Sequence, residues 1–210
     1  MRLRNVTGAK EVIEKSKYVI LDPVKNCCKW QSIFGNNNPI HIEIGMGKGD
    51  FIREHAKRDT NINFIGIEKF DNVIVRAVQK LEDTNYENLK LIRMDALEIN
   101  EVFKNEVDCI YLNFSDPWPK NRHEKKRLTS NNFLDKYDSV FKKTKKIIMK
   151  TDNRKLFEFS VTSFVEKGYK IDNLSLDLYG DDIKDNIPTE YETKFNLKGQ
   201  VIYMIEVSKM

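Results

Sequence analysis

The segment Ile40–Phe51, with the sequence IHIEIGMGKGDF, constrains the fold more than any other part of the chain. Its first half alternates isoleucine with polar residues after Pro39, and this period of two predicts a short strand. Its second half carries three glycines, which permit a tight turn and a close approach to the backbone. Apolar residues at helical spacing follow, so a helix is predicted to begin there. Strand, glycine-rich turn and helix N-terminus together form a place where backbone amides can meet a ligand.

The spacing of these glycines narrows the class of ligand. A dinucleotide-binding fingerprint needs G-x-G-x-x-G, but Asp50 occupies the position of the third glycine, and a phosphate-binding loop needs Ser or Thr where this chain has Gly49. The pattern Glu43-x-Gly45-x-Gly47-x-Gly49 instead resembles the first motif of S-adenosylmethionine-dependent methyltransferases. That resemblance implies a backbone that admits the amino-acid end and the ribose of the cofactor. A glycine-rich turn without a ligand is the alternative that the glycines alone leave open.

Acidic residues end the next two predicted strands. The strand over residues 63–68 ends in Glu68, 23 positions after Gly45, close to the spacing of about 20 at which an acid binds ribose hydroxyls. The strand over residues 89–94 is followed by Asp95-Ala96. In methyltransferases of this class, an acid at this point binds the adenine amino group, whereas a turn or helix cap is the other interpretation of Asp95. A helix predicted over residues 70–81 makes strands and helices alternate, which indicates a parallel sheet.

The remaining patterns extend the same α/β arrangement. Further strands are predicted over residues 107–114 and 145–150, amphipathic segments over 9–18, 133–141 and 156–165, and a last antiparallel pair over 169–179 and 201–207. Trp30 is predicted to be buried. We predict a Rossmann-like α/β fold of the class I methyltransferase type, with a mostly parallel central sheet, helices on both faces and an antiparallel C-terminal strand. One domain is expected over residues 1–210, with an N-terminal basic arm and helix over 1–38, where Arg2 and Arg4 lie, and a catalytic core over 39–210.

Composition indicates an ordinary soluble protein. Of 210 residues, 40% are hydrophobic and 32% are charged, and 36 basic against 32 acidic residues give a net charge of +4 that matters only if it is clustered. No segment approaches the roughly 18 apolar residues that span a bilayer, and the N-terminus lacks the apolar stretch of a signal peptide. Cys27, Cys28 and Cys109 form neither a disulfide framework nor a zinc-binding spacing. We therefore expect a cytoplasmic protein, a monomer or homodimer, with no membrane association and no metal.

The segment of residues 115–123, SDPWPKNRH, follows a predicted strand and is the least regular part of the chain. Pro117 and Pro119 remove amide donors and fix φ, so a stiff loop is predicted. The loop lies at the carboxyl end of a strand, where ligands bind in open α/β sheets. Trp118 can stack on a base or cap the core. Basic residues in and after the loop are either solvated or predict phosphate contacts with a nucleic acid, and they are Lys120, Arg122, His123, Lys125, Lys126 and Arg127.

At this loop the chain resembles the bacterial tRNA (guanine-N7-)-methyltransferase family. The segment Asn113–His123, with Lys125–Thr129 after it, is similar to the signature of that family, and Glu43, Glu68 and Asp95 match its cofactor positions. Its later motifs are matched by Lys150–Asn153, by Thr189–Glu192 with Phe195, and by Lys198-Gly199. The resemblance covers nearly the whole chain. Val6-Thr7-Gly8 departs from it, because relatives commonly carry Lys-Pro-Trp near the N-terminus.

The resemblance implies transfer of a methyl group from S-adenosylmethionine to N7 of a guanosine in the tRNA variable loop, which gives 7-methylguanosine. Asp116 is the expected catalytic residue, because a carboxylate near the base stabilises the positive charge that moves from sulfur to the purine. The expected cofactor-binding residues are Glu43, Gly45, Gly47, Gly49, Glu68, Asp95, Ala96 and Asp116. The expected tRNA-binding residues are Lys120, Arg122, His123, Lys125, Lys126, Arg127, Asp152, Thr189, Glu190, Tyr191 and Glu192.

Other interpretations of these motifs stay open. The Asp-Pro-Trp segment loosely resembles the loop of methyltransferases that act on exocyclic amines, although the basic residues after it argue against that class. An RNA-binding module with a vestigial nucleotide site is a second alternative, and a nicotinamide oxidoreductase ranks last. Without the family resemblance, the sequence is equally consistent with Asp152 as a helix N-cap. It is also consistent with Thr189 and Glu192 as ordinary loop residues.

Overall fold

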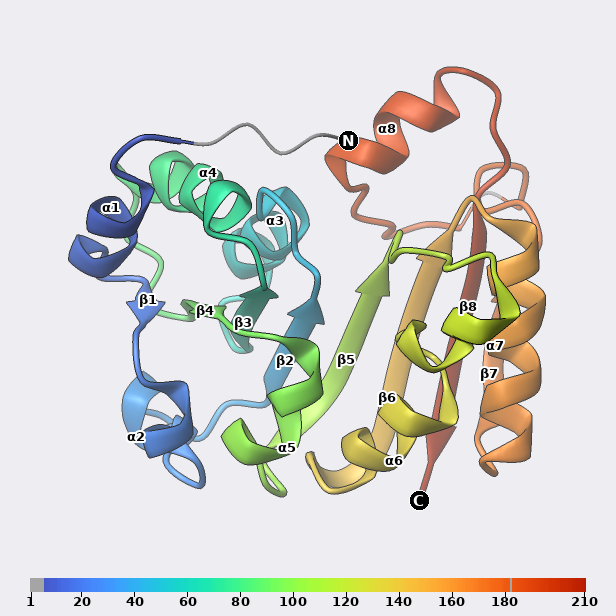
Figure 1. The fold of residues 1–210 in the computed structure, drawn as a ribbon, viewed down its shortest axis with the longest axis horizontal. Coiled ribbons are helices and arrows are strands. Elements are labelled where there is room, and N and C mark those ends of the chain that lie inside the picture. Colours follow the sequence, from blue (N-terminus) through green and yellow to red (C-terminus); the bar gives the residue numbers. More distant parts are fainter. Residues whose placement is uncertain (1–5, 182) are drawn as a thin grey trace.

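The protein is built on one eight-stranded sheet, seen here in a computed structural model that describes residues 6–181 and 183–210 (Figure 1). The strands are β1 (Val19–Ile20), β2 (Ile40–Ile44), β3 (Asn63–Glu68), β4 (Leu89–Arg93), β5 (Val107–Asn113), β6 (Phe141–Thr151), β7 (Lys170–Ser175) and β8 (Tyr203–Lys209). The α-helices are α1 (Ala9–Lys15), α2 (Trp30–Phe34), α3 (Asp50–Arg58), α4 (Asp71–Leu81), α5 (Ile99–Val102), α6 (Asn131–Asp138), α7 (Arg154–Glu166) and α8 (Glu190–Asn196). Short 3₁₀ segments are η1 (Pro23–Asn26), η2 (Ala96–Glu98) and η3 (Asn121–Lys126).

The order of the strands creates a crevice at the centre of the sheet. The order is β1-β4-β3-β2-β5-β6-β8-β7, and β8 runs antiparallel to both of its neighbours, β6 and β7. From β2 the chain builds β3 and β4 outward on one side, then returns to place β5 on the other side of β2. Ligands bind at such a reversal, beyond the carboxyl ends of the strands. This topology confirms the predicted Rossmann-like fold and its antiparallel C-terminal strand.

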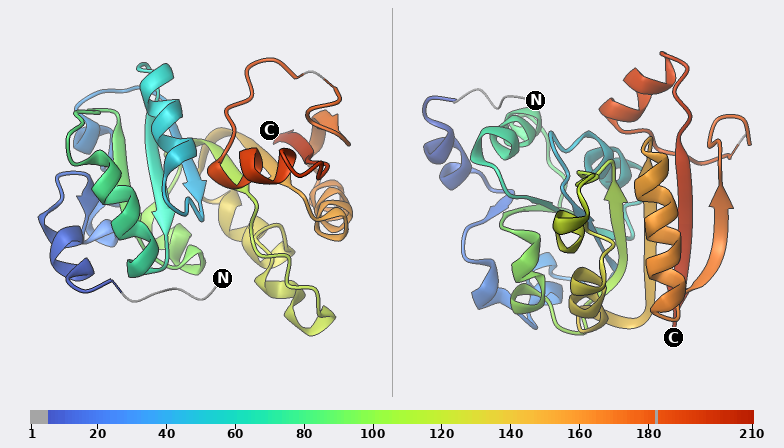
Figure 2. Two further views of the ribbon diagram at one scale, coloured as in Figure 1. Left: turned by 90° about the horizontal axis from the view of Figure 1, so that it is seen from above. Right: turned by 45° about the vertical axis from the view of Figure 1, so that its right-hand side comes forward.

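Helices cover both faces of the sheet (Figure 2), and a cluster of buried apolar side chains lies on each face. The three isoleucines of β2 pack with apolar residues of α2, α5, α6 and α7. The other face is covered by α1, α3 and α4, which pack against Phe64, Leu89 and Leu91. Trp30 is fully buried, as predicted, and its indole N–H donates to the Val102 carbonyl over 3.0 Å. Burial on two faces explains the near-continuous apolar sequence of the central strands.

Several boundaries differ from the predicted ones, and β7, for example, ends at Ser175 rather than at residue 179. The amphipathic segment of residues 9–18 forms a helix only as far as Lys15, because Ser16 is extended and directs the chain into β1, beside β4. Strand β6 begins at Phe141 rather than at residue 145. Its lysine-rich first half shows no apolar alternation, and pairing with β5 and β8 holds it in the sheet.

Arg2 and Arg4 of the predicted basic arm lie outside the described residues. Within the described ranges, no helix combines the length and the apolar character that crossing a membrane requires.

Candidate active site

The glycine-rich turn after β2 has the conformation that its sequence predicts. Gly45, Gly47 and Gly49 have φ angles of 77°, 59° and 74°, which disfavour residues with a Cβ atom. The amides of Gly45 and Met46 both donate to the Ile67 carbonyl, over 2.9 and 3.0 Å, and hold the turn against β3. Helix α3 begins directly after Gly49. At Gly45 and Gly47 a Cβ would meet no atom within 4 Å, so the backbone is open on that side.

Glu68 joins the glycine turn to the end of β3. Its Oε1 accepts hydrogen bonds from the amides of Lys69 and Phe70, over 2.8 and 3.0 Å, and its Oε2 accepts from Gly47 over 3.2 Å. Burial raises the pKa of Glu68, while these three amides oppose that rise. Because a carboxylate oxygen has two lone pairs, Oε2 can accept a further hydrogen bond from a ligand hydroxyl.

A cavity of about 570 Å³ lies beyond the carboxyl ends of the central strands. It brings together seven residues that the sequence predicted for the site, namely Gly45, Glu68, Asp95, Ala96, Asp116, Lys125 and Lys126. Its apolar walls include Phe70, Val73, Leu97, Leu128 and Phe133, which the sequence interpretation did not include. Exposed Phe70 and Leu97 were detectable only as apolar residues two positions after Glu68 and Asp95. Apolar walls with a few placed carboxylates are typical of a small-molecule site.

Asp95 is both a cap and part of the cavity wall. Its Oδ1 accepts from the Leu97 amide over 3.0 Å, which caps η2, and its Oδ2 pairs with Lys69 Nζ at 2.6 Å. Desolvation alone would raise the pKa of Asp95, but the Leu97 amide and the Lys69 ammonium lower it below its usual value. The cap and cofactor interpretations of Asp95 are therefore compatible.

The loop after β5 is braced by its own basic residues. Phe114 and Trp118 have positive φ angles of 50° and 41°, so the chain turns sharply on each side of Asp116, which is exposed and borders the cavity. Arg127 donates to the carbonyls of Pro117 and Trp118, both over 3.2 Å, and the Lys126 ammonium lies 4.7 Å from the centre of the Trp118 ring. Arg127 therefore stabilises the loop by bonding its carbonyls, whereas Lys120, Arg122 and Lys125 are exposed. His123 packs edge-on to Trp118, with ring centres 5.6 Å apart.

Glu43 lies beneath the site, away from the cavity wall. Its side chain is 2% exposed, and Asn113 Nδ2 donates to its Oε1 over 2.9 Å. Its Oε2 is buried and has no hydrogen-bond partner in the described part of the chain. Burial raises the pKa of Glu43 to about 7, against the lowering effects of Asn113 and the Lys150 charge. This carboxyl is therefore sensitive to protonation near neutral pH.

The segment before α8 is anchored to the end of β6 by a buried ion pair. Lys150 Nζ pairs with Glu192 Oε2 at 2.5 Å, and both side chains are buried. The same ammonium donates to the Ile187 carbonyl and to Asn186 Oδ1, over 2.9 and 3.0 Å. Thr189 and Glu192 form a capping box at the start of α8. Lys150 was not among the predicted site residues, because a lysine at a strand end carries no local signal of its partner.

Residues 186–196, called the α8 segment below, also contact the glycine turn and the loop after β5. Glu190 pairs with Lys48 at 2.7 Å, and Tyr191 donates to Asp152 Oδ2 over 3.0 Å. The Tyr191 ring lies between Phe114 and Phe195, with ring centres 4.9 and 4.0 Å away. Asp152 does not cap α7, because Asn153 does so by accepting from the Leu156 amide. Of the predicted residues, those that do not border the cavity are Glu43, Gly47, Gly49, Lys120, Arg122, His123, Arg127, Asp152 and Thr189–Glu192.

Comparison with known proteins identifies the family. Residues 37–205 match a family model described as "Putative methyltransferase". A tRNA (guanine-N(7)-)-methyltransferase of Bacillus velezensis is 51% identical over 209 residues, which are 99% of this chain and 96% of the relative. The chain belongs to the tRNA (guanine-N(7)-)-methyltransferase family.

Solved structures of other methyltransferases share the fold of this family member. One, described as "Structure of an Antibiotic Related Methyltransferase", has a TM-score of 0.65 at 20% identity and covers 87% of this chain and 92% of its own. Another, a SAM-dependent methyltransferase from Aquifex aeolicus, has a TM-score of 0.56 at 12% identity and covers 99% of this chain and 100% of its own. At these identities the likeness is one of fold.

Proposed function

We propose that this protein is a cytoplasmic enzyme that transfers the methyl group of S-adenosylmethionine to N7 of a guanosine in the variable loop of tRNA, which gives 7-methylguanosine. The observation that carries this proposal is one cavity bordered by Gly45, Glu68, Asp95 and Asp116, with Lys125 and Lys126 at its edge. A nucleoside site joined to a basic surface suits a cofactor and a nucleic acid that react together. Membership in the tRNA (guanine-N(7)-)-methyltransferase family supports the choice of reaction.

The residues at the cavity fit S-adenosylmethionine. The open backbone at Gly45 and Gly47 leaves room for the amino-acid end, and the Glu68 Oε2 atom can accept from a ribose hydroxyl. Phe70 and Leu97 present apolar surface on which an adenine ring can pack, beside the Asp95 carboxylate. When bound, S-adenosylmethionine supplies an electrophilic methyl group on a sulfonium sulfur.

Guanine N7 carries an in-plane lone pair and no proton, so the reaction needs no general base. The task of the protein is to hold the acceptor in line with the methyl group, and positioning of this kind can lower a barrier by about 7 to 11 kcal/mol. Positive charge develops on the purine during transfer. We assign Asp116, exposed at the cavity after β5, to stabilise that charge.

The surroundings of the cavity suit a base taken out of a folded RNA. Extraction of a base costs a few kcal/mol, which contacts to the displaced nucleotide must offset. Lys120, Arg122 and Lys125 can neutralise phosphates. Phe114, which borders the cavity and packs on the Tyr191 ring, offers an aromatic surface to such a base.

The first test is incubation of the protein with S-adenosylmethionine and unmodified tRNA, followed by digestion of the RNA and mass spectrometry of its nucleosides. We expect 7-methylguanosine from this tRNA and none from a matched tRNA whose variable-loop guanosine is replaced by adenosine. A methyl group on an exocyclic amine would assign the protein to a different methyltransferase class. Cofactor binding without RNA methylation would indicate another acceptor, and calorimetry without S-adenosylmethionine binding would favour a plain RNA-binding module.

A further inference from the structure

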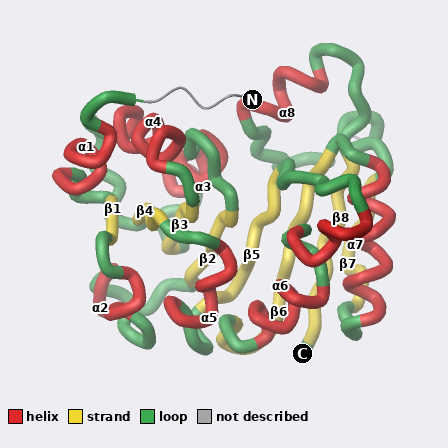
Figure 3. The backbone as a smooth tube through the Cα atoms, in the orientation of Figure 1, coloured by secondary structure: helices red, strands yellow, loops and turns green. Residues whose placement is uncertain are grey.

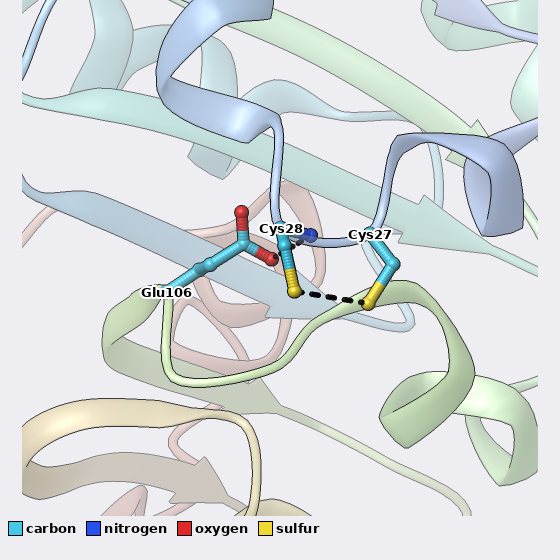
Figure 4. A group of neighbouring side chains, drawn as sticks. All are labelled: Cys27, Cys28 and Glu106. Atoms are coloured by element: carbon cyan, nitrogen blue, oxygen red, sulfur yellow. Dashed lines mark hydrogen bonds between the residues drawn. The ribbon is translucent and has the colours of Figure 1, made fainter.

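Cys27, Cys28 and Glu106 meet at the end of the sheet opposite the cavity (Figure 4). Within the described ranges, this is the one group of at least three Cys, His, Asp or Glu residues whose ligand atoms all lie within 4.8 Å of one another. The two cysteines are adjacent in the turn between η1 and α2, and Glu106 directly precedes β5. The two sulfur atoms are 3.7 Å apart, and both cysteines are free thiols.

The Glu106 carboxylate is held in place by backbone donors. Its Oε2 accepts from the amides of Cys28 and Lys104, over 2.9 and 3.3 Å, and its Oε1 accepts from the amide of Trp30 over 3.1 Å. Since Trp30 is fully buried, these bonds fix the carboxylate relative to the core. The carboxylate keeps further lone pairs with which it can bind a cation without releasing the turn. Hydrogen bonds that orient a ligand in this way are typical of metal sites.

The separation of the sulfur atoms suits a thiophilic cation. In a tetrahedral zinc site with Zn–S bonds of about 2.3 Å, two sulfur ligands lie about 3.8 Å apart. The thiols must lose their protons to bind a metal. Burial, Cys28 and Glu106 raise the pKa of the Cys27 thiol, and the Lys104 charge opposes them, so protons and cation compete for the site.

We propose that Cys27, Cys28 and Glu106 form a binding site for one thiophilic divalent cation such as Zn²⁺, with water as the fourth ligand. Through two thiolates and one carboxylate, the bound cation would link the turn before α2 to the start of β5. Cation binding releases two thiol protons to the solvent, and no electron transfer is involved. The spacing of the cysteines predicted no metal because the third ligand lies 78 positions from Cys28 and reaches it only through the fold.

The test is titration of the reduced, full-length protein with Cd²⁺, observed through the sulfur-to-cadmium charge-transfer absorption, and competition of the bound Cd²⁺ by Zn²⁺. We expect one cation per chain and about two protons released per cation in weakly buffered solution. Cys27→Ser and Cys28→Ser should each weaken binding by more than the roughly 10- to 100-fold that loss of a supporting contact costs. Glu106→Gln should weaken binding at least about tenfold while the absorption band persists.

Cys109→Ala is the matched control, because Cys109 is a buried thiol in β5 outside this group. It should keep the wild-type stoichiometry and affinity. The proposal is overturned if no band appears, if binding survives in Cys27→Ser/Cys28→Ser, or if Glu106→Gln binds as tightly as wild type.

Discussion

At the scale of single residues, two carboxylates near the glycine turn lie in opposite surroundings. Asp116 is exposed at the cavity and can face a cationic purine. Glu43 is buried beneath the turn, with one oxygen bonded to Asn113 and the other without a partner among the described residues. We propose that the first affects the reaction and that the second affects stability.

Asp116→Ala should lower the rate of methyl transfer by about 100-fold or more, because loss of one electrostatic stabiliser typically costs about 2.7 to 4 kcal/mol. Affinity for tRNA should change by no more than about a few-fold, since the basic residues remain. Single-turnover rates and tRNA binding measure the two effects separately. Asp116→Asn, which keeps the shape and removes the charge, should be nearly as slow. A near-normal rate in both variants would show that the assigned role is wrong.

Glu43→Gln should remove a pH dependence of stability. The pKa of Glu43 is raised from 4.5 to about 7, so the folded protein keeps a proton that the unfolded chain has lost. The stability contributed by this group is therefore fully present below about pH 4.5 and is lost as the pH rises through about 7. Between about pH 5 and pH 8, the free energy of unfolding of the wild type should fall by on the order of 3 kcal/mol relative to that of the variant. Urea unfolding at both pH values measures the difference, and parallel curves for the two proteins would contradict it.

At the scale of elements, the loop after β5 and the α8 segment are held by different forces. The loop is stiffened by two prolines and by Arg127, which bonds its carbonyls. The α8 segment depends on Lys150, whose ammonium makes three hydrogen bonds to residues 186–192. Desolvation lowers the pKa of Lys150, and the charges of Glu192 and Glu43 oppose this. Figure 3 draws most of the segment between β7 and β8 as loop, in green, with α8 as a red helix within it.

Lys150→Met should release the α8 segment. It leaves Glu192 buried without its cation, and breaking a buried pair in this way costs about 3 to 5 kcal/mol. Amide hydrogen exchange should accelerate over residues 186–196 more than in β2 or β3, and the KM for tRNA should rise. Lys150→Met/Glu192→Leu is the control, because it removes both charges and should recover most of the lost stability. Unchanged exchange in the single variant would argue against the anchor.

Arg122→Ala/Lys125→Ala should weaken tRNA binding and flatten its dependence on salt. Each lost phosphate contact reduces the slope of log affinity against log salt by about 0.7 to 0.9. Arg127→Ala should instead slow transfer with little change of slope, because its guanidinium bonds the loop. Filter binding over a salt series distinguishes the two variants. Equal salt slopes for wild type and the double variant would show that Arg122 and Lys125 do not contact tRNA phosphates.

At the scale of the whole molecule, the order of the strands decides which segments meet. The reversal between β2 and β5 places the glycine turn, the ends of β3 and β4 and the loop after β5 around one cavity. The long connection between β7 and β8 carries α8 back over the glycine turn, where Glu190 pairs with Lys48 (Figure 1). Cofactor binding should therefore be linked to the stability of the fold.

S-adenosylmethionine should raise the free energy of unfolding by about 2.7 kcal/mol when its concentration is 100 times its dissociation constant, and the unfolding temperature should rise accordingly. Gly45→Ala should lose this stabilisation, because a side chain at a φ of 77° strains the turn on its open side. Gly168→Ala is a matched control, since Gly168 has the same φ and equally open surroundings at the end of α7, away from the cavity. Thermal unfolding of each variant with and without cofactor measures the stabilisation. Equal cofactor-induced shifts in the unfolding temperature of the two variants would contradict the placement of the cofactor.

Much of the fold and part of the site follow from local patterns in the chain. The alternating isoleucines, the positive-φ glycines and the acids at strand ends are local signals, because pleat, turn and cap geometry involve neighbours in sequence. They predicted β2 to β5, α3 and α4, and three of the residues that border the cavity, namely Gly45, Glu68 and Asp95, whereas Asp116 was expected from the family resemblance. The two-residue strand β1 is too short to show a period, so only its pairing with β4 defines it.

Burial and long-range partners were decided by the tertiary structure. Lys150 meets Glu192 across 42 positions, and Cys28 meets Glu106 across 78. The pKa of Glu43 depends on helices and strands that exclude water from every side, which no spacing in the chain encodes. Whether a charged side chain binds a ligand, braces a loop or anchors a helix depends on which atoms surround it, and packing between distant segments places those atoms.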